Sequence, residues 1–273
     1  MVNNAFMGVD QGKKYNEQYK KLVFDEQGLP DLKIVDYNKE IKGKKILSIG
    51  AGVGADLWFL TKTNKVEALD ASSFAVNTAK RHDIKAKVAD VSKKLPYISN
   101  SFDIVVLKDI LEHLLDPVAL LLEAKRVVKK KGYLIISLPN HFWWWFRFRI
   151  LFGKNLLWKT LQHSHVKDFE EWNYMHVRFF TWHGVKKLMQ KVDLKIVKEY
   201  WDFGTWAHYS DPEMFYTVLK NKKNKSFQAR LFLKIMYPIY SLVNLVFPRK
   251  IRAKIVKLNP GLFCAGFYLK VKK

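Results

Sequence analysis

A glycine-rich turn is the first feature of the sequence that could hold a ligand. Gly50, Gly52 and Gly54 alternate with small residues directly after an apolar run that begins at Lys45. Glycine at a strand-to-helix turn permits a positive φ and lets the backbone approach a ligand closely. The N-terminus of the following helix carries a partial positive charge, which favours an anionic group such as a carboxylate. Alone, this spacing is a weak signal of ligand binding.

Two aspartates extend the same candidate site. Asp70 ends the second expected strand, about 20 residues after the first glycine, where a carboxylate can accept hydrogen bonds from ribose hydroxyls. Asp90 ends the third expected strand and could meet an adenine amino group. Each also has a structural interpretation, Asp70 as the N-cap of the segment from Ser72 and Asp90 as a turn former before Ser92. Three candidate sites at three successive strand ends, along one sheet edge, favour the ligand-binding interpretation.

Alternating strand and helix signals place these residues on that edge. Near-continuous apolar strands that alternate with helices indicate a parallel sheet covered on both faces. We expect an α/β fold, a Rossmann-like doubly wound and mostly parallel seven-stranded sheet with two helical or aromatic insertions. The expected strands are 45–50, 66–70, 84–90, 102–107, 133–138, 194–200 and 266–271, and the expected helices follow the glycine turn and Ser72 and occupy 117–130 and 181–191.

The expected domain boundaries follow from where this alternation breaks. Residues 1–43 are expected to form a helical lead-in, 44–204 the core with an insertion at 141–180, 205–262 a basic and apolar helical insertion, and 263–273 the final core strand. The length of 273 residues suits one elaborated domain. The single cysteine, Cys264, cannot form an internal disulfide, and residues 1–10 lack a secretory pattern, so we expect a cytoplasmic protein.

The run from Lys44 to Asn140 resembles the class I S-adenosylmethionine-dependent methyltransferases, especially the broad group that includes the quinone-pathway O-methyltransferases. The matching stretches are ILSIGAGVGADLWFL, VEALD, AKVADVSKKLPYISNSFDIVVLKDILEHLLDP and LLLEAKRVVKKKGYLIISLPN. A nicotinamide dehydrogenase would instead carry G-x-G-x-x-G. The resemblance implies S-adenosylmethionine as cofactor, with the glycines around its methionine moiety, Asp70 on its ribose and Asp90 with Val91 beside its adenine. The full set of implied cofactor residues is Ser48, Gly50, Gly52, Gly54, Asp70, Ala71, Asp90, Val91 and Lys108.

Ser48 departs from the family pattern, which commonly has an acidic residue two positions before the first glycine. That acid helps to hold the amino group of the cofactor, partly through water. A serine can accept a hydrogen bond but supplies no charge. The departure therefore allows weaker cofactor binding, or a catalytically inert relative.

The segment after the fourth strand, residues 108–113, lies where the resemblance places the transferred methyl group. Methyl transfer is an in-line displacement, and an acceptor hydroxyl gains from a general base. Histidine suits that role, so His113 with Glu112 is the candidate catalytic pair. Alternatively, both residues cap and orient the following helix. The pattern Asp109-x-x-Glu112-His113 also resembles a metal-binding cluster of some quinone O-methyltransferases, but Asp109 replaces a longer Glu there, and we assign no metal.

The aromatic insertion occupies the slot that this family uses for acceptor specificity. Residues 141–158 read HFWWWFRFRILFGKNLLW, which is typical either of a membrane-interface element or of an aromatic lid over the acceptor pocket. Trp144 is its candidate acceptor contact. The stretch MHVRFFTWHGVKKLM resembles a recurring H-x-R-x-F-T feature of relatives linked to glycan, lipid or quinone modification, which makes His176 and Arg178 candidate contacts for an anionic acceptor. A zinc site that uses His163 and His165 lacks paired ligand spacing.

Positive charge is the unusual global property of the chain. The 48 Lys and Arg against 25 Asp and Glu give a formal net charge of +23, which attracts nucleic acid or anionic lipid headgroups. Residues 220–273 contain no Asp or Glu but roughly 14 Lys and Arg. The apolar run 231–247 is too short for a spanning helix and predicts an interfacial one, or else a helical cap on the core. Its basic flank is Arg230, Arg249, Lys250, Arg252, Lys254 and Lys257.

Three functions remain open on the sequence alone. The leading one is a methyltransferase that O-methylates a small, lipid-linked, quinone-like or glycan acceptor, with the protein peripheral on the anionic inner face of a membrane. A methyltransferase acting on RNA through the basic face is the second, although no RNA-binding module is recognisable. The third is an inert binding or scaffold protein, which rests on Ser48 alone. The sequence gives no oligomeric state.

Overall fold

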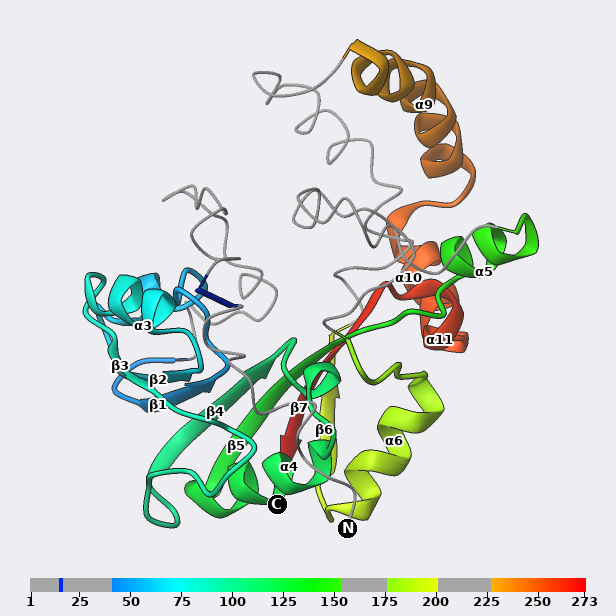
Figure 1. Ribbon diagram of the computed structural model, residues 1–273. Coiled ribbons are helices and arrows are strands. Elements are labelled where there is room, and N and C mark those ends of the chain that lie inside the picture. Colours follow the sequence, from blue (N-terminus) through cyan, green and yellow to red (C-terminus); the bar gives the residue numbers. More distant parts are fainter. Residues whose placement is uncertain (1–14, 17–40, 154–175, 201–226) are drawn as a thin grey trace.

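The computed structural model describes residues 15–16, 41–153, 176–200 and 227–273. Within these residues, seven strands form one sheet in the order β3-β2-β1-β4-β5-β7-β6 (Figure 1). Only β7 runs antiparallel to its neighbours, so the expected mostly parallel α/β sheet is confirmed. The strands are β1 (Lys45–Ile49), β2 (Lys65–Asp70), β3 (Lys85–Val88), β4 (Phe102–Lys108), β5 (Val128–Pro139), β6 (Lys195–Glu199) and β7 (Gly266–Lys272).

Alternation of side chains along the central strands builds a core on each face of the sheet. On β1 and β4, Leu47, Val105 and Leu107 point to one face, and Ile46 and Val106 point to the other. All five are buried, which explains why these strands read as continuous apolar runs. The first face is covered by α4 (Pro117–Val127) and α6 (Trp182–Lys191), and the second by η3 (Trp58–Leu60) and α3 (Ser73–Lys80).

Side-chain caps fix where the covering helices begin. Ser72 accepts a hydrogen bond from the backbone N–H of Ala75 and caps α3, as expected. Asp116 caps α4, with Pro117 in its first turn. Thr181 caps α6. The seven strands and the helices that begin at Ser73, Pro117 and Trp182 therefore lie near their expected places, and the carboxyl ends of β1, β2, β3 and β4 meet at one edge.

Four more helices lie beyond that edge. They are α5 (Trp144–Leu151), α9 (Phe227–Val246), α10 (Arg249–Leu258) and α11 (Pro260–Phe263), and α9 stands farthest from the sheet (Figure 1). Arg252 is buried and donates to Oδ1 of Asn244 and to the carbonyl of Phe247, which ties α10 to α9. Arg252 therefore does not belong to the exposed basic flank where the sequence placed it. Among the described helices, none is both long and apolar enough to cross a membrane.

Two expectations about elements are corrected. The helix expected after the glycine turn is only the short 3-10 helix η3, preceded by turns. The helix from Pro117 ends at Val127 rather than near Lys130, because β5 begins at Val128 and is longer than expected. Of the lead-in 1–43 only residues 15–16 and 41–43 are described, and of the insertions 141–180 and 205–262 only 141–153, 176–180 and 227–262, so the domain boundaries stay predictions.

Candidate functional site

The glycine turn leaves β1 in a conformation that favours glycine. Gly50, Gly52 and Gly54 have φ values of +69°, +55° and +75°. A Cβ at Gly50 would lie 2.7 Å from Cδ1 of Ile110, and one at Gly54 would lie 2.6 Å from Cδ1 of Ile84. Gly50 donates its backbone N–H to the carbonyl of Leu69 over 2.8 Å, which holds the turn against β2. Backbone conformation therefore favours glycine at both positions, and at Gly50 the close packing against Ile110 favours it as well.

The Asp70 carboxylate joins the glycine turn to the start of α3. Its Oδ2 accepts from the backbone N–H of Gly52 and its Oδ1 from that of Ser72, each over 2.8 Å. Because Ser72 is the N-cap of α3, the alternative interpretation of Asp70 as that cap is wrong. Burial raises the pKa of Asp70, against the backbone hydrogen bonds that lower it. Asp70 thus lies at the end of β2 beside the glycine turn, where a carboxylate can accept hydrogen bonds from a ribose diol.

The neighbouring strand end carries the candidate adenine residues. Ala89 donates its N–H to the carbonyl of Asp70 over 3.0 Å, which sets the chain leading to Asp90 beside β2. Oδ1 of Asp90 accepts from the N–H and hydroxyl of Ser92 at 3.0 and 2.6 Å, so the turn-forming role is present. Asp90 is exposed and Val91 half-buried, which leaves both able to border a ligand. Their contact with adenine stays a prediction, as does that of half-buried Ala71.

Ser48 and Lys108 lie on one face of the sheet. Ser48 of β1 is in register with Val106 of β4, and Lys108 is two residues further along β4, so their side chains point the same way. Ser48 is buried, and Lys108 is half-buried with its Nζ 2.5 Å from Oδ2 of Asp56. Asp56 follows the glycine turn. The sequence analysis did not identify it as a candidate, because it expected this position to lie in the helix after the turn.

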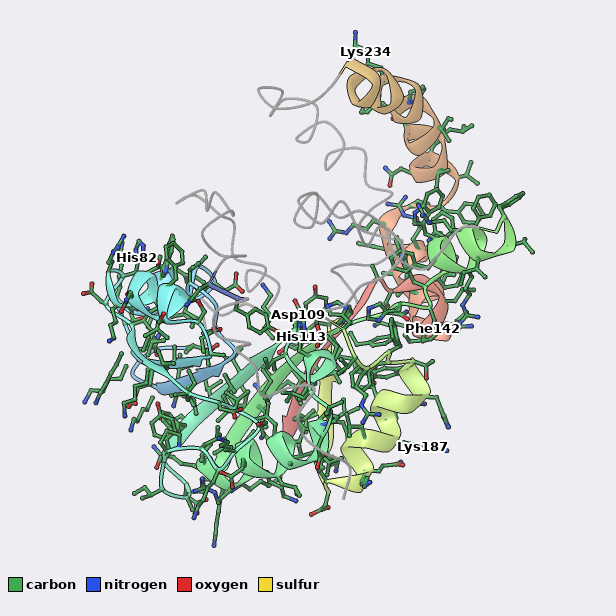
Figure 2. The ribbon with its side chains drawn as sticks, viewed as in Figure 1. His82, Asp109, His113, Phe142, Lys187 and Lys234 are labelled. Atoms are coloured by element: carbon green, nitrogen blue, oxygen red, sulfur yellow. The ribbon has the colours of Figure 1, made fainter. Side chains whose placement is uncertain are left out.

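A cluster of one carboxylate and three histidines forms where β4 and β5 end. His113 ends the short helix η4 (Leu111–His113), and its ring centroid lies 4.7 Å from that of His176. Nδ1 of His176 lies 2.8 Å from Nε2 of His141, and Nε2 of His176 lies 4.0 Å from Oε1 of Glu112. Figure 2 shows Asp109 and His113 at this edge of the sheet.

Backbone hydrogen bonds dock the His176 segment onto η4. The carbonyl of Glu112 accepts from the N–H groups of Val177 and Arg178, at 2.8 and 3.1 Å. The guanidinium of Arg178 donates to the carbonyl of Leu115. The structure therefore places His176 beside His113 and Arg178 against η4, and their contact with an acceptor stays a prediction.

Glu112 is the most strongly perturbed group of this cluster. Its side chain is fully buried, and neither carboxylate oxygen has a hydrogen-bond partner among the described residues. Burial, and after it the negative charge of Asp109, raise the pKa of Glu112 well above its ordinary value. Burial and the nearby His113 lower the pKa of His141 to about 4. A buried carboxylate cannot touch an acceptor that enters from solvent, so a part of Glu112 in catalysis would run through its neighbours.

The residues that could hold a metal ion differ from the pattern in the sequence. Ligand atoms of Glu112, His113 and His176 all lie within 4.8 Å of one another. Asp109 instead accepts a hydrogen bond from the Ser137 hydroxyl, over 2.9 Å. The aspartate of the acidic–histidine pattern is thus engaged by β5, and His176 takes its place in the cluster.

The remaining sequence candidates lie away from this cluster or outside the described residues. Trp144 is in α5, which stands apart from His113 in the views of Figures 1 and 2, so its role as an acceptor contact stays a prediction. His163 and His165 lie outside the described residues. Sequence reasoning missed His141, although it follows β5 directly and the rule applied to the other strand ends would have found it.

The chain is similar to known methyltransferases over part of its length. Residues 47–136 match the family described as "Methyltransferase domain". The ubiquinone biosynthesis O-methyltransferase of Neisseria meningitidis is 25% identical over 118 residues, covering 40% of this chain and 50% of that protein. The mitochondrial ubiquinone biosynthesis O-methyltransferase of Schizosaccharomyces pombe is 34% identical over 105 residues, covering 35% and 38%. The chain thus spans about half the length, or less, of these curated relatives.

A solved structure extends the likeness in fold over most of the chain. A putative methyltransferase from Bacillus halodurans superposes with a TM-score of 0.51 at 15% identity, covering 89% of this chain and 98% of that one. At that identity the likeness concerns the fold alone. Residues 47–136 are therefore a methyltransferase domain, built on the Rossmann-like fold of the class I S-adenosylmethionine-dependent methyltransferases.

Proposed function

We propose that this protein O-methylates a lipid-linked, quinone-like or glycan acceptor at a membrane surface, with S-adenosylmethionine as methyl donor. The observation that carries the proposal is the place of His113. It is half-buried directly beyond β4, on the sheet edge that also carries the glycine turn and Asp70. A titratable side chain there can remove a proton from a hydroxyl held beside the cofactor.

The residues of this chain would bind the cofactor, align the acceptor hydroxyl with it and deprotonate that hydroxyl. When bound, the cofactor supplies an electrophilic methyl group on a sulfonium. The glycine turn and Asp70 would hold it, and His113 would take the proton of the acceptor hydroxyl that is methylated. His176 and Glu112 would orient the imidazole, because the His176 ring packs on that of His113 and the ligand atoms of all three residues lie within 4.8 Å of one another.

Exposed apolar side chains on α5, α9 and α10 support a membrane surface as the place of reaction. Leu151 at the end of α5, Leu245 on α9 and Leu258 on α10 are 79%, 77% and 84% exposed. Basic residues stand among them, and near an anionic membrane each can add about 1 kcal/mol of binding free energy. The exposed ones are Lys234, Arg249, Lys250, Lys254 and Lys257.

Flotation with vesicles tests the membrane part. The wild-type protein is expected to float with phosphatidylglycerol vesicles, and the double variant Leu242→Ser/Leu245→Ser to float less. The control is Ile98→Ser, because Ile98 is 81% exposed but precedes β4, far along the chain from α9. Equal flotation of all three proteins would mean that Leu242 and Leu245 do not contact the membrane. Release by RNA but not by salt-matched buffer would favour the RNA-directed alternative.

Methyl transfer itself is tested with radiolabelled S-adenosylmethionine. We expect label to enter the organic phase when the protein is incubated with a bacterial lipid extract presented in the same vesicles. A purified hydroxylated polyprenyl quinone precursor and total RNA serve as parallel acceptors. Label in RNA alone would overturn the proposed acceptor class. No label in any acceptor, from a protein that binds the cofactor, would favour an inert scaffold.

A further inference from the structure

One ion pair connects the glycine turn to the end of β4. Lys108 is the last residue of β4, and its Nζ lies 2.5 Å from Oδ2 of Asp56, two residues beyond Gly54. The side chains are 20% and 30% exposed, so the pair is partly withdrawn from water but not sealed from it. A carboxylate and an ammonium thus stand together where the cofactor site begins.

The pair lies on the sheet face where the family pattern has a charge that this chain lacks. Ser48 stands where an acid is common, and its side chain shares a face with that of Lys108. The two residues belong to adjacent strands, with Ser48 in register two residues before Lys108. Asp56 therefore brings a carboxylate toward that face from the other side of the glycine turn.

The charges match the amino-acid end of the cofactor. The methionine moiety of S-adenosylmethionine carries an α-ammonium and an α-carboxylate, which are a cation and an anion on one carbon. We propose that Asp56 accepts from the α-ammonium and Lys108 donates to the α-carboxylate, so that Asp56 replaces the acid missing at Ser48. Charge-assisted hydrogen bonds are among the stronger ones, and partial burial limits their screening by salt. This inference rests on the proposed cofactor but not on the proposed acceptor.

The competing interpretation is that the pair only braces the turn. The two interpretations differ in which ligands should lose affinity when the ion pair is removed. S-adenosylhomocysteine has the amino-acid end, whereas 5′-methylthioadenosine has the nucleoside and sulfur without it. Removal of a brace would lower the affinity for both ligands alike, whereas removal of a recognition pair would lower only the affinity for S-adenosylhomocysteine.

Calorimetric titration of both ligands, without acceptor, separates these cases. For Asp56→Asn and Lys108→Met we expect about tenfold or greater loss of affinity for S-adenosylhomocysteine, as for lost charge-assisted hydrogen bonds. Affinity for 5′-methylthioadenosine should stay within about twofold of wild type. Lys129→Met is the matched control, because Lys129 pairs with Asp103 near the amino end of β4, and it should bind both ligands as wild type does.

Three outcomes would overturn the inference. Equal losses for both ligands would make the pair a brace, and unchanged S-adenosylhomocysteine binding in folded variants would remove the pair from the site. A wild-type protein that binds neither ligand would overturn the cofactor assignment and this inference with it. A failed acceptor screen alongside the selective loss would leave the inference standing and contradict only the proposed acceptor. Thermal melting of each variant shows whether it is folded.

Discussion

Gly52 donates its backbone N–H to Oδ2 of Asp70 over 2.8 Å, so one hydrogen bond joins the glycine turn after β1 to the end of β2. Two residues that are 18 positions apart in sequence are thereby fixed at one point of the sheet edge. The turn cannot shift without disturbing the carboxylate, which also holds Ser72 at the start of α3. We therefore expect changes in the turn to alter ligand binding as well as stability.

Gly50→Ala tests how tightly the turn is packed. Gly43 is the matched control, because both residues have positive φ, +69° and +66°, but a Cβ at Gly43 would meet nothing within 4 Å. Gly43→Ala should cost about 1 kcal/mol in the free energy of unfolding, from the backbone alone. Gly50→Ala should cost about 1–3 kcal/mol more, because its Cβ would lie 2.7 Å from Ile110.

Urea unfolding of both variants measures this difference. Gly50→Ala should also bind S-adenosylhomocysteine more weakly, whereas Gly43→Ala should bind it as wild type does. Equal losses of stability in the two variants would mean that Ile110 moves aside freely, and that close packing does not fix the turn.

His113→Gln tests the assignment of the base. A lost general base typically lowers kcat by about 100-fold or more. We expect that loss with unchanged affinity for S-adenosylhomocysteine, because His113 lies beyond the residues assigned to the cofactor. His82→Gln is the control, since His82 stacks on Trp58 at 3.6 Å between ring centroids, on the α3 side of the molecule (Figure 2). Turnover by His113→Gln close to that of wild type would make His113 a structural residue.

His141 should make the fold sensitive to acid. Its pKa is lowered to about 4, whereas an unfolded histidine titrates near 6.5, so between these pH values the unfolded chain binds more protons than the folded one. The free energy of unfolding that neutral His141 contributes is therefore fully present above about pH 6.5. It is lost as the pH falls toward 4, by up to about 3 kcal/mol.

Unfolding free energies of wild type and His141→Phe, measured from pH 7 to pH 4.5, check this sign. The variant should lose less stability on acidification than wild type. His183→Phe is the control, because His183 is exposed on α6, and it should follow wild type. A variant that loses as much stability as wild type would show that His141 is already protonated in the folded protein.

The strands and the site edge could be predicted from the sequence because their signals are local. Buried strands such as β4 read as continuous apolar runs, Asp70 ends β2, and Asp90 lies two residues beyond β3. The glycines at Gly50 and Gly54 were identified by their spacing, and their positive φ supplies the physical reason.

The contacts that shape the site could not be predicted, because they join distant residues. The bond from His141 to His176 crosses 35 positions, and that from Lys108 to Asp56 crosses 52. No periodicity encodes such pairs. Arg252 shows the same limit, since its sequence neighbours indicated a solvated basic face and its contacts with α9 buried it.

Calorimetric titration of wild type and Asp70→Ala with S-adenosylmethionine and S-adenosylhomocysteine tests the central claim most directly. Asp70 ends β2 at the sheet edge beside the glycine turn, and a hydrogen bond to a charged group contributes about 1.5–3 kcal/mol. The account predicts that wild type binds both ligands and that Asp70→Ala, while still folded, binds them at least about tenfold more weakly. A folded wild-type protein that binds neither ligand would contradict it.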